Sequence, residues 1–410
     1  MKNFYLLLLF LSSVLSSEAQ SWMDTSPLST NKINTVGFAN DNFTGWAFGD
    51  STIGLNFQYG IIYKTTNQGF SWTEQDMGSD SIQINDCYVL SNQEVVGIGK
   101  FQTTGNGAFI RTTDGGLTWI KDSTSIPERL FDVDFVGTSN GWTVGRNGYI
   151  GMSNNSGASW SPQTSGTGED LFGISFVDQL NGWAVGADGG NGGEILHTSD
   201  GGLNWSSQTN TVQGDLFAVN AISATEAVAV GQGGLILYTS DSGLTWNTQT
   251  SGTGNDLFDV IFSDASNGRA VGGSGTILIT SDAGTTWTSE VSNTTNDIND
   301  LFEGQNNISW FGGDNGDVYI FSTQLPNGID ESQLLDVSIY PNPTTGIIHV
   351  EGDITSEMEM TVSDLSGKRI IQEKISVSKE FDLTDCEPGT YIYVISTEGQ
   401  INAIGKIVKK

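Results

Sequence analysis

Few residues of this sequence are suited to catalysis. The two histidines, His197 and His349, stand far apart, and neither has a second histidine or a cysteine near it. A zinc site needs a cluster of such ligands, and a hydrolytic triad needs a histidine beside its nucleophile. We therefore predict no metal site, no cofactor and no histidine-dependent catalysis. The 47 Asp and Glu residues leave one enzymatic alternative open, because paired carboxylates can cleave glycosidic bonds.

A second group of residues is suited to binding. Cations beside aromatic rings favour a sugar ring or an acidic polymer as ligand. The sequence offers this combination if the fold brings together Lys32, Phe57, Tyr59, Lys100, Phe101, Arg129 and Arg146. These residues are spread over three successive units of a repeat, so the prediction depends on how the repeat folds.

The repeat predicts the elements that would position these residues. Six segments share a turn that ends in tryptophan, and the tryptophans recur every 41 to 47 residues, the length of a four-stranded propeller blade. We predict an all-β fold with a seven-bladed β-propeller. The six tryptophans are Trp72, Trp119, Trp160, Trp205, Trp246 and Trp287. The seven inner strands are expected to begin at Ile33, Ile84, Leu130, Leu171, Leu216, Leu257 and Ile298.

The two ends of the repeat region are expected to pair. The seventh unit, from Ile298 to about Ser322, lacks the turn and the fourth strand. Residues 21–24 (SWMD) match the segments that begin at the repeat tryptophans, such as WSPQ and WNTQ, and they also precede an inner strand. This segment would supply the missing strand, and closing the ring would remove its edge strands.

The repeated turn has a structural explanation. Its acidic or amide side chain can accept backbone N–H bonds, the glycine two residues later permits positive φ, and the tryptophan can pack between blades. We interpret the copies as one structural device, not as calcium ligands or catalytic carboxylates. The aspartates are Asp114, Asp200, Asp241 and Asp282, and Asn67 and Asn155 take the same place in two further units.

The residue before each inner strand is expected at the mouth of the central channel. Half of this mouth is basic or neutral and half is acidic, since the residues in order are Lys32, Gln83, Arg129, Asp170, Asp215, Asp256 and Asp297. Long loops are expected after the second strand in units one, two and four (residues 50–59, 100–106 and 187–192). The first two loops would place Phe57, Tyr59, Lys100 and Phe101 beside Lys32 and Arg129, with Arg146 in the next loop.

Composition and charge agree with an exported β protein. The chain has 53 Gly, 7 Pro, 11 Trp and 20 Phe, which is typical of many short strands and tight turns. A net charge of -31 excludes nucleic acid and anionic membranes as expected partners. Residues 1–20 have the basic start, apolar run and small-residue cleavage site of a secretory signal, and no transmembrane segment is expected. Cys87 and Cys386 fall in different predicted domains, which excludes a disulfide framework.

The pattern changes near the C-terminus. We assign residues 21–322 to the propeller, 323–336 to a linker and 337–410 to a second domain. Alternating apolar residues predict a small, immunoglobulin-like β-sandwich there. The region also carries an ordered set of residues: Tyr340, Pro341, Asn342, Pro343, Gly346, Gly367, Lys368, Gly389 and Tyr391.

Both regions resemble known families. The unit GWAVG (182–186) followed by TSDGGLNW (198–205) resembles the Asp-box, or bacterial neuraminidase (BNR), repeat of the photosystem II assembly and stability factors, and more distantly sialidases and sortilin-type receptors. This resemblance implies the fold and not the function. Sialidases need three convergent arginines and a FRIP segment. The repeat region has no FRIP segment, and Arg111, one of its few arginines, falls on a third strand.

The ordered C-terminal residues resemble the C-terminal sorting domain of type IX secretion in Bacteroidetes. This resemblance implies passage across the outer membrane, removal of the domain, and surface attachment or release. We therefore predict a monomeric, secreted or cell-surface propeller that interacts with the type IX secretion machinery.

We predict that this propeller binds an extracellular protein or polysaccharide and has no enzymatic activity. A glycan-active hydrolase or lyase of the Asp-box propeller type is the alternative. Xyloglucan-active endoglucanases use such propellers but hold their substrate between two of them, whereas this chain has one. A carboxylate pair about 5–10 Å apart in a deep cleft would favour the enzyme, and a shallow aromatic mouth would favour binding.

Overall fold

The computed structural model describes residues 22–27, 31–53, 57–77, 82–122, 126, 128–189, 192–209, 213–305, 308–322, 337–352, 358–364, 369–375, 379–397 and 400–410. The elements in these ranges are β-strands and a few single turns of 3-10 helix. No helix in the described part of the chain is long and apolar enough to cross a membrane. The predicted signal, residues 1–20, and the predicted linker, residues 323–336, lie outside the described residues.

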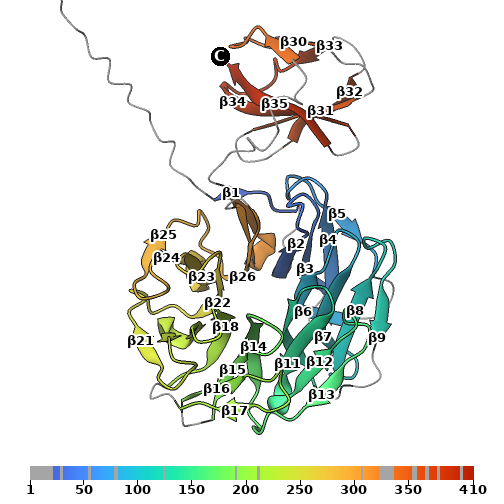
Figure 1. Ribbon diagram of the computed structural model, residues 1–410. Coiled ribbons are helices and arrows are strands. Elements are labelled where there is room, and N and C mark those ends of the chain that lie inside the picture. The colour runs from blue at the N-terminus through green and yellow to red at the C-terminus, as the bar shows by residue number, and fades with distance from the viewer. Residues whose placement is uncertain are drawn as a thin grey trace, which may run out of the picture.

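Four-stranded antiparallel sheets follow one another around a ring between Met23 and Ser322 (Figure 1). Each sheet is numbered here as a blade in the order of its inner strand. Blade 1 holds β2 (Lys32–Phe38), β3 (Gly45–Ile53), β4 (Phe57–Thr65) and β5 (Thr73–Gln75). Blade 2 holds β6 (Ile82–Val89), β7 (Val95–Phe101), β8 (Gly107–Thr112) and β9 (Ile120–Asp122). Blade 3 holds β10 (Leu130–Val136), β11 (Asn140–Gly145), β12 (Ile150–Ser153) and β13 (Ser161–Gln163), with the helical turn η1 (Arg146–Gly148).

The remaining sheets repeat this order. Blade 4 holds β14 (Leu171–Phe176), β15 (Gly182–Asp188), β16 (Gly193–Thr198) and β17 (Ser206–Ser207). Blade 5 holds β18 (Leu216–Ala221), β19 (Ala227–Gly231), β20 (Ile236–Thr239) and β21 (Asn247–Gln249), with η2 (Gln232–Gly234). Blade 6 holds β22 (Leu257–Phe262), β23 (Gly268–Gly272), β24 (Thr276–Thr280) and β25 (Thr288–Glu290), with η3 (Gly273–Gly275). Blade 7 holds β26 (Ile298–Glu303), β27 (Ile308–Gly313), β28 (Val318–Ser322) and β1 (Met23–Asp24), with η5 (Asp314–Gly316).

The predicted pairing of the two ends is confirmed. In β1, Met23 pairs with Ile320 and Asp24 with Tyr319, so the outer strand of blade 7 comes from the start of the chain. Trp22 is 2% exposed. Its ring packs on Phe311 and Phe321, with centroids 4.7 and 5.2 Å away. Its Nε1 donates to Glu290 Oε1 of blade 6 at 2.7 Å. The first and last parts of the ring are thus joined by backbone pairing and by a buried aromatic contact.

The hydrogen bonds predicted for the repeated turn are present. In blade 5, Asp241 Oδ1 accepts Thr245 N at 2.9 Å, and Gly243 N donates to Thr239 Oγ1 at 2.9 Å. Gly243 has φ +78°, as the turn requires. The amide of Asn155 in blade 3 accepts Ser159 N in the same way at 3.0 Å. Hydrogen bonds from the hydroxyl and the backbone N–H of Thr118, four residues later, lower the pKa of Asp114 to about 2.

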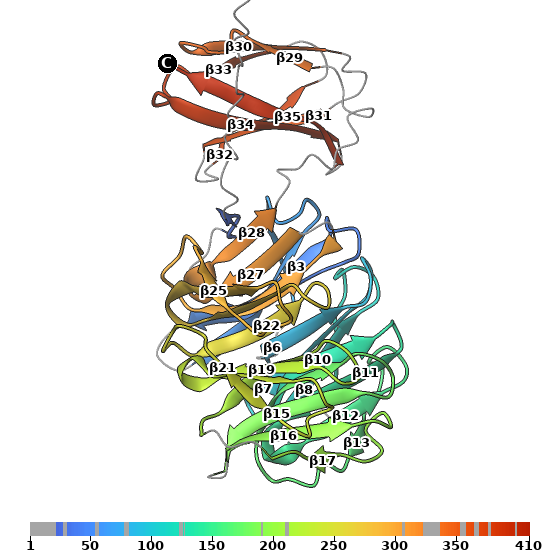
Figure 2. The same ribbon diagram turned by 60° about the vertical axis from the view of Figure 1, so that its left-hand side comes forward.

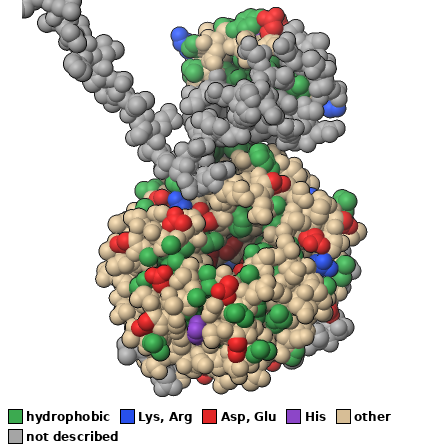
Figure 3. All heavy atoms as spheres, viewed as in Figure 1, with side chains coloured by type: hydrophobic (Ala, Val, Ile, Leu, Met, Phe, Trp, Pro, Cys, Tyr) green, Lys and Arg blue, Asp and Glu red, His purple; other side chains and the backbone are tan. Residues whose placement is uncertain are grey.

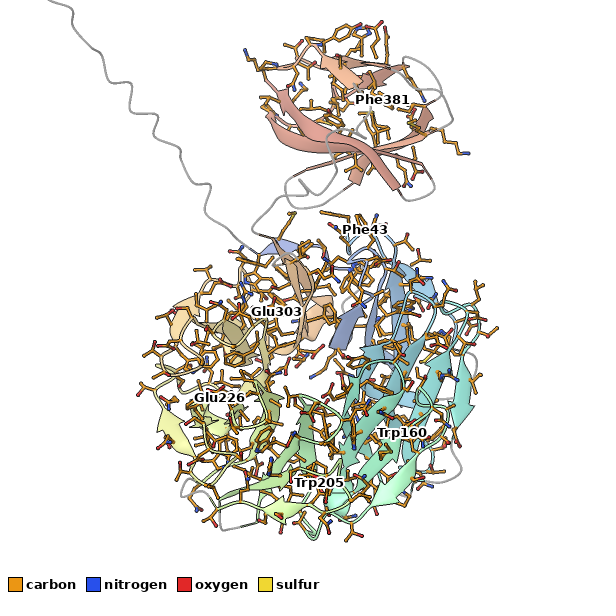
Figure 4. All side chains as sticks on the ribbon, in the orientation of Figure 1. Phe43, Trp160, Trp205, Glu226, Glu303 and Phe381 are labelled. Atoms are coloured by element: carbon orange, nitrogen blue, oxygen red, sulfur yellow. The ribbon has the colours of Figure 1, made fainter. Side chains whose placement is uncertain are left out.

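The propeller core lies between neighbouring sheets. One cluster joins Trp142 of blade 3 with Phe176 of blade 4, whose rings stack at 3.7 Å. The turn tryptophans also contact the preceding blade. Trp160 of blade 3 stacks on Phe109 of blade 2 at 4.9 Å, and Trp205 and Trp246 donate to Gln163 and Gln208 of the blade before (Trp160 and Trp205 are labelled in Figure 4). Each of these blades therefore shares its core with a neighbour.

The C-terminal region has a core of its own. One sheet holds β29 (Val337–Tyr340), β30 (Ile347–Gly352) and β33 (Lys379–Asp382), and the other β32 (Arg369–Ile375), β31 (Met358–Asp364), β34 (Gly389–Thr397) and β35 (Gln400–Lys409). The two sheets form separate layers (Figure 2), and Phe381 of β33 lies between them (Figure 4). Phe381 packs with Met360, Ile395 and Ile407 of the second sheet in one buried cluster. Two sheets that share one core agree with the predicted sandwich.

Candidate functional site at the channel mouth

The centre of the ring is hollow, and acidic side chains are visible inside it (Figure 3). Every inner strand has an irregularity in pairing near its start, for example between Leu130 and Asp132 of β10 and between Leu257 and Asp259 of β22. A bulge of this kind re-aims the side chains around it. The residues just before and after the first inner-strand residue therefore face the channel mouth or the neighbouring blade.

The structure brings three of the predicted cations together. Burial lowers the pKa of Lys100, and the charges of Arg129 and Arg146 lower it further. Burial and the charge of Arg146 likewise lower the pKa of Arg129, against the opposing influence of Asp50. Arg129 also donates from Nη2 to Asn85 Oδ1 at 2.6 Å, and its guanidinium lies 5.1 Å from the ring centre of Phe131. Like charges are thus held close together in a protein that is strongly acidic.

Lys32, the fourth predicted cation, is directed toward blade 7. Its Nζ lies 3.2 Å from Asp314 Oδ1 and donates to Asn299 Oδ1 at 3.2 Å. Both partners of this ion pair are more than one-third exposed, so water and salt weaken it. Lys32 therefore borders the cationic group, and its ion-pair partner belongs to blade 7.

Asp50 is a site residue that the sequence analysis did not identify. It is 3% exposed, and its Oδ2 accepts Gln83 Nε2 at 2.7 Å and Asn34 Nδ2 at 3.0 Å. Burial raises the pKa of Asp50, while these hydrogen bonds and the charges of Lys32 and Arg129 act in the opposite direction. Asp50 Oδ1 and Gln83 Oε1 are buried and have no hydrogen-bond partner among the described residues. Two acceptor atoms are therefore free at the base of the cationic group.

The long loops predicted at the mouth are largely strands. Pairing between β3 and β4 continues to Ile53 and Phe57, and β7 extends through Lys100 to Phe101. In blade 4, β15 continues to Asp188 and pairs with Gly193. Continued cross-strand pairing thus turns most of these connections into extended hairpins. Phe57 and Tyr59 lie on β4, and the structure does not describe their side chains.

Phe101 is not a free loop side chain. It is partly buried and packs against a cluster that includes Trp46 and Ile82 between blades 1 and 2. Replacing Phe101 by alanine should therefore lower the stability of the propeller, because the ring contributes to the core between two blades.

The acidic half of the mouth has a structural cause. Asp170 Oδ1 accepts Asn147 N of η1 at 2.9 Å, Asp256 Oδ1 accepts Gly233 N of η2 at 2.7 Å, and Asp297 Oδ1 accepts Ser274 N of η3 at 2.8 Å. In each case the aspartate of one blade holds a tight turn of the blade before it. These three aspartates follow blades in which the turn after the second strand is short. This explains much of the difference between the acidic and the basic half of the mouth.

A layer of carboxylates lies deeper in the channel. Asp86, Asp132, Asp259 and Asp300 all stand directly after the irregularity in pairing of an inner strand. Each accepts a backbone N–H of a neighbouring blade, as when Asp132 Oδ2 accepts Ile174 N at 2.6 Å and Asp300 Oδ2 accepts Val36 N at 2.7 Å. Together with Asp134, which accepts Phe176 N at 2.6 Å, they connect neighbouring blades around the ring. Reading this repeat position down the sequence would have revealed the layer.

These carboxylates repel one another. Burial raises the pKa of Asp132 and of Asp134 to about 7. Burial and the charge of Asp132 raise the pKa of Asp86, and burial and the charge of Asp300 raise the pKa of Asp259. The side chains surround a common channel and touch its solvent, but dense protein behind them limits hydration of the charged form.

Stability should consequently fall as these carboxylates ionise. Their folded pKa is raised above the unfolded value near 3.8, so their stabilising contribution is full below that pH and is lost as pH rises through about 7. We expect a higher melting temperature at pH 5 than at pH 8. Asp132→Asn should reduce this difference, because an amide can donate to Asp86 without adding charge. A melting temperature that is equal or higher at pH 8 would contradict this account.

An arc of phenylalanines lines the mouth in blades 3 to 6. Neighbouring ring centres lie 5.2 Å apart for Phe131 and Phe172, 6.1 Å for Phe172 and Phe217, and 6.0 Å for Phe217 and Phe258. All four rings are partly exposed. Blades 7, 1 and 2 have asparagine at this position, for example Asn299, whose Nδ2 donates to Ile33 O of the next blade at 2.8 Å. The sequence analysis did not identify this arc, although the repeated Leu-Phe pairs could have revealed it.

The catalytic groups considered from the sequence remain dispersed. His197 lies on β16 and packs on Trp183 with ring centres 4.6 Å apart, and burial lowers its pKa. His349 lies on β30 in the C-terminal region beside Glu380. Arg269 of blade 6 pairs with Glu303 at 2.6 Å near the ring closure. Within the ranges described above, no group of three or more His, Cys, Asp or Glu is arranged to hold a metal ion.

The proposed sorting residues surround one end of the C-terminal fold. Tyr340 ends β29 and donates to Glu351 Oε2 at 2.7 Å, and Asn342 Oδ1 accepts Val408 N at 2.8 Å. Gly346 N donates to Thr344 Oγ1 at 3.0 Å, and Tyr391, at the start of β34, donates to Glu387 O at 2.7 Å. The peptide bonds before Pro341 and Pro343 are cis. Gly389 begins β34, whereas Gly367 and Lys368 lie outside the described residues.

Two family models match parts of the chain. Residues 338–410 match the secretion system C-terminal sorting domain. Residues 152–251 match the photosynthesis system II assembly factor YCF48. No curated protein matches the chain by sequence. The sorting-domain match implies export to the cell surface or beyond.

Solved structures give the same fold. YCF48 from Cyanidioschyzon merolae is 19% identical with a TM-score of 0.59, over 74% of this chain and 99% of its own. A structure described as YCF48 bound to D1 peptide is 18% identical with a TM-score of 0.59, over 74% of this chain and 97% of its own. PorZ, a surface component of the type IX secretion system of Porphyromonas gingivalis, is 14% identical with a TM-score of 0.56, over 93% of this chain but only 59% of its own. The chain thus combines an Asp-box β-propeller that resembles YCF48 with a C-terminal type IX secretion sorting domain.

Proposed function

We propose that this chain is an exported, seven-bladed propeller that binds an extracellular protein or polysaccharide at its channel mouth. Residues 21–322 form the propeller, 323–336 the linker, and 337–410 an immunoglobulin-like sorting sandwich. The sheet order supports the blade count, because each of the seven inner strands identified from the repeat begins a sheet of four strands. The exported protein works as a monomer on the cell surface or in the medium.

The observation that carries the proposal is the cationic group formed by Lys100, Arg129 and Arg146. Arg146 lies 3.7 Å from Asp170 Oδ2, and Asp50 opposes the charge of Lys100 and Arg129, but the three cations still repel one another and burial lowers the pKa of Lys100 and Arg129. Asp50 moderates the charge but keeps Oδ1 unpaired. A ligand that combines an acidic group with a hydroxyl or N–H donor would satisfy both the cations and this acceptor.

The comparisons support a protein or polysaccharide outside the cell as the ligand. YCF48, which has a similar propeller, has been solved with a bound peptide. PorZ, also similar in fold, is a surface component of the type IX system. By analogy, we propose that the secretion machinery recognises the C-terminal domain while the propeller mouth remains available for its own ligand.

Glycan hydrolysis or elimination is the alternative function. Carboxyl groups with a raised pKa, such as Asp86 and Asp132, are common in catalytic sites. Their bonds to backbone N–H groups of the next blade already account for their position. Glycan cleavage by the wild type that is lost in Asp132→Asn, with binding retained, would favour the alternative.

Charge reversal tests the proposed site. A ligand should first be identified on a glycan array and among extracellular proteins. Replacing Lys100, Arg129 and Arg146 by glutamate should then weaken its binding by at least tenfold at low salt. The wild-type affinity itself should fall as salt rises, since at about 0.1 M the screening length is about 10 Å.

The matched control is the acidic half of the mouth. Asp215→Asn and Asp256→Asn should matter little for an acidic or sugar-rich ligand. Replacement of Phe57 and Tyr59 by alanine should weaken binding. Phe101 should be replaced by leucine and not by alanine, because its ring packs in the core. Loss of binding in the two asparagine variants, with normal binding in the others, would place the site on the acidic side.

A further inference from the structure

The phenylalanine arc occupies a repeat position at which other blades have asparagines that bond to their neighbours. At the same repeat position, Asn34, Asn85 and Asn299 each donate to a backbone carbonyl of the next blade. The four phenylalanines of blades 3 to 6 cannot make that bond, and they leave partly exposed rings at the mouth. Rings in contact around a concave rim form a continuous aromatic surface, which is a common feature of binding sites.

Carboxylates lie beside this aromatic surface. Asp132 and Asp259 of the carboxylate layer follow Phe131 and Phe258 directly in the sequence. The rim aspartates Asp170, Asp215 and Asp256 stand two residues before Phe172, Phe217 and Phe258. Burial and the charge of Asp300 raise the pKa of Asp259, so a cation bound beside this group would favour its ionised form. Such a surface is complementary to a group with an apolar stem and a positive end.

The structure contains one internal example of this contact. The guanidinium of Arg129 lies 5.1 Å from the ring centre of Phe131, the first ring of the arc. Among the described residues, no lysine or arginine lies over Phe172, Phe217 or Phe258 in the same way. A cation is attracted to the face of an aromatic ring, and more strongly when water is excluded.

We propose that Phe172, Phe217 and Phe258 form a docking surface for a lysine or arginine side chain of an extracellular protein partner. The aliphatic stem packs on the rings, and the charged end is directed toward the carboxylate layer. The proposal rests on the binding function proposed for the mouth. It gives a role to the half of the mouth that lacks the cationic group. A protein surface that presents both acidic and basic groups would contact both halves.

The test uses the full chain and short fluorescent peptides, acetyl-Gly-Ser-X-Ser-Gly-amide, in which X is lysine, arginine, norleucine or glutamate. Fluorescence anisotropy should show at least tenfold tighter binding of the lysine or arginine peptide than of the norleucine peptide. Norleucine keeps the apolar stem and removes the charge. Equal binding of these peptides, or no binding of the basic ones, would overturn the proposal.

Two variants locate the contact. Phe217→Leu with Phe258→Leu keeps apolar volume and should weaken the lysine peptide by at least fivefold. Phe43→Leu changes a phenylalanine that is 40% exposed outside the arc, and it should bind the peptide as the wild type does. An arc variant with wild-type affinity and normal melting would refute the proposal. If the arc variant fails to fold, competition of the lysine peptide by butylammonium but not by butanol decides the question on the wild-type chain.

The charge-reversal variant separates this inference from the proposed function. Glutamate at positions 100, 129 and 146 should leave binding of the lysine peptide unchanged or slightly stronger. If that variant loses the natural ligand while no basic peptide binds the wild type, the docking surface is refuted and the binding function stands. If it retains the natural ligand while the lysine peptide requires the arc, the cationic site is wrong and the docking surface stands.

Discussion

Deletion of residues 21–24 is expected to lower the melting temperature of the propeller by about 10 °C. This change removes the outer strand of blade 7 and the buried Trp22 ring, which packs between Phe311 and Phe321. Loss of a buried tryptophan side chain alone costs about 3–5 kcal/mol, and 1 kcal/mol corresponds to about 2–4 °C in a domain of this class. The deletion also leaves Glu290 without its Trp22 donor and exposes an edge of β28.

Two controls test whether the loss of stability is specific to the closing strand. Met23→Ala alters a side chain of the same strand that is 36% exposed, so it should change the melting temperature by less than about 2 °C. Removing residues 337–410 should also have little effect on the propeller transition, because that region has its own buried cluster. Similar small losses in the residue 21–24 deletion and in both controls would refute the closure of the ring through the N-terminal strand.

Removal of residues 328–410 is expected to abolish export while the propeller still folds. The sorting-domain match covers residues 338–410, and its core residues come from within that range. The truncated protein should therefore accumulate in the periplasm of its host with an unchanged propeller melting transition. Fractionation of periplasm, surface and medium, followed by immunodetection, measures the distribution.

The reciprocal transfer supplies the control for export. Residues 323–410 placed after an unrelated periplasmic protein should carry that protein to the surface or medium. Undiminished appearance of the truncated propeller in the medium would contradict the assignment of the C-terminal domain as an export signal, whatever the outcome of the transfer.

The sequence was sufficient to predict the repeated elements of the ring. The turn around Asp241 and Gly243 depends on local hydrogen bonds and a positive φ, so its residues identify it wherever it occurs. The position of Trp22 before an inner strand was enough to predict the pairing of β1 with β28. Both features follow from residue types at fixed spacing within one unit.

The details of the mouth were less predictable because they depend on contacts between blades. Asp50 accepts a hydrogen bond from Gln83 of the next blade, which is 33 residues away in sequence. Asp256 is part of the rim because it caps η2 of the preceding blade. A sequence pattern within one unit does not specify these partners, whereas the repeat column would have revealed the aspartate and phenylalanine layers.

The most direct test of the account compares two sets of neutralised cations in one binding assay. The first variant replaces Lys100, Arg129 and Arg146 by glutamine. The second replaces Lys64, Arg111 and Lys121, which lie on the third strands β4 and β8 and the outer strand β9. Both variants change the net charge equally, so long-range electrostatics cannot distinguish them. We predict that the first variant binds the identified extracellular ligand at least tenfold more weakly than the wild type, while the second binds it with wild-type affinity. Equal affinity of the two variants, or a loss confined to the second, would contradict binding at the channel mouth.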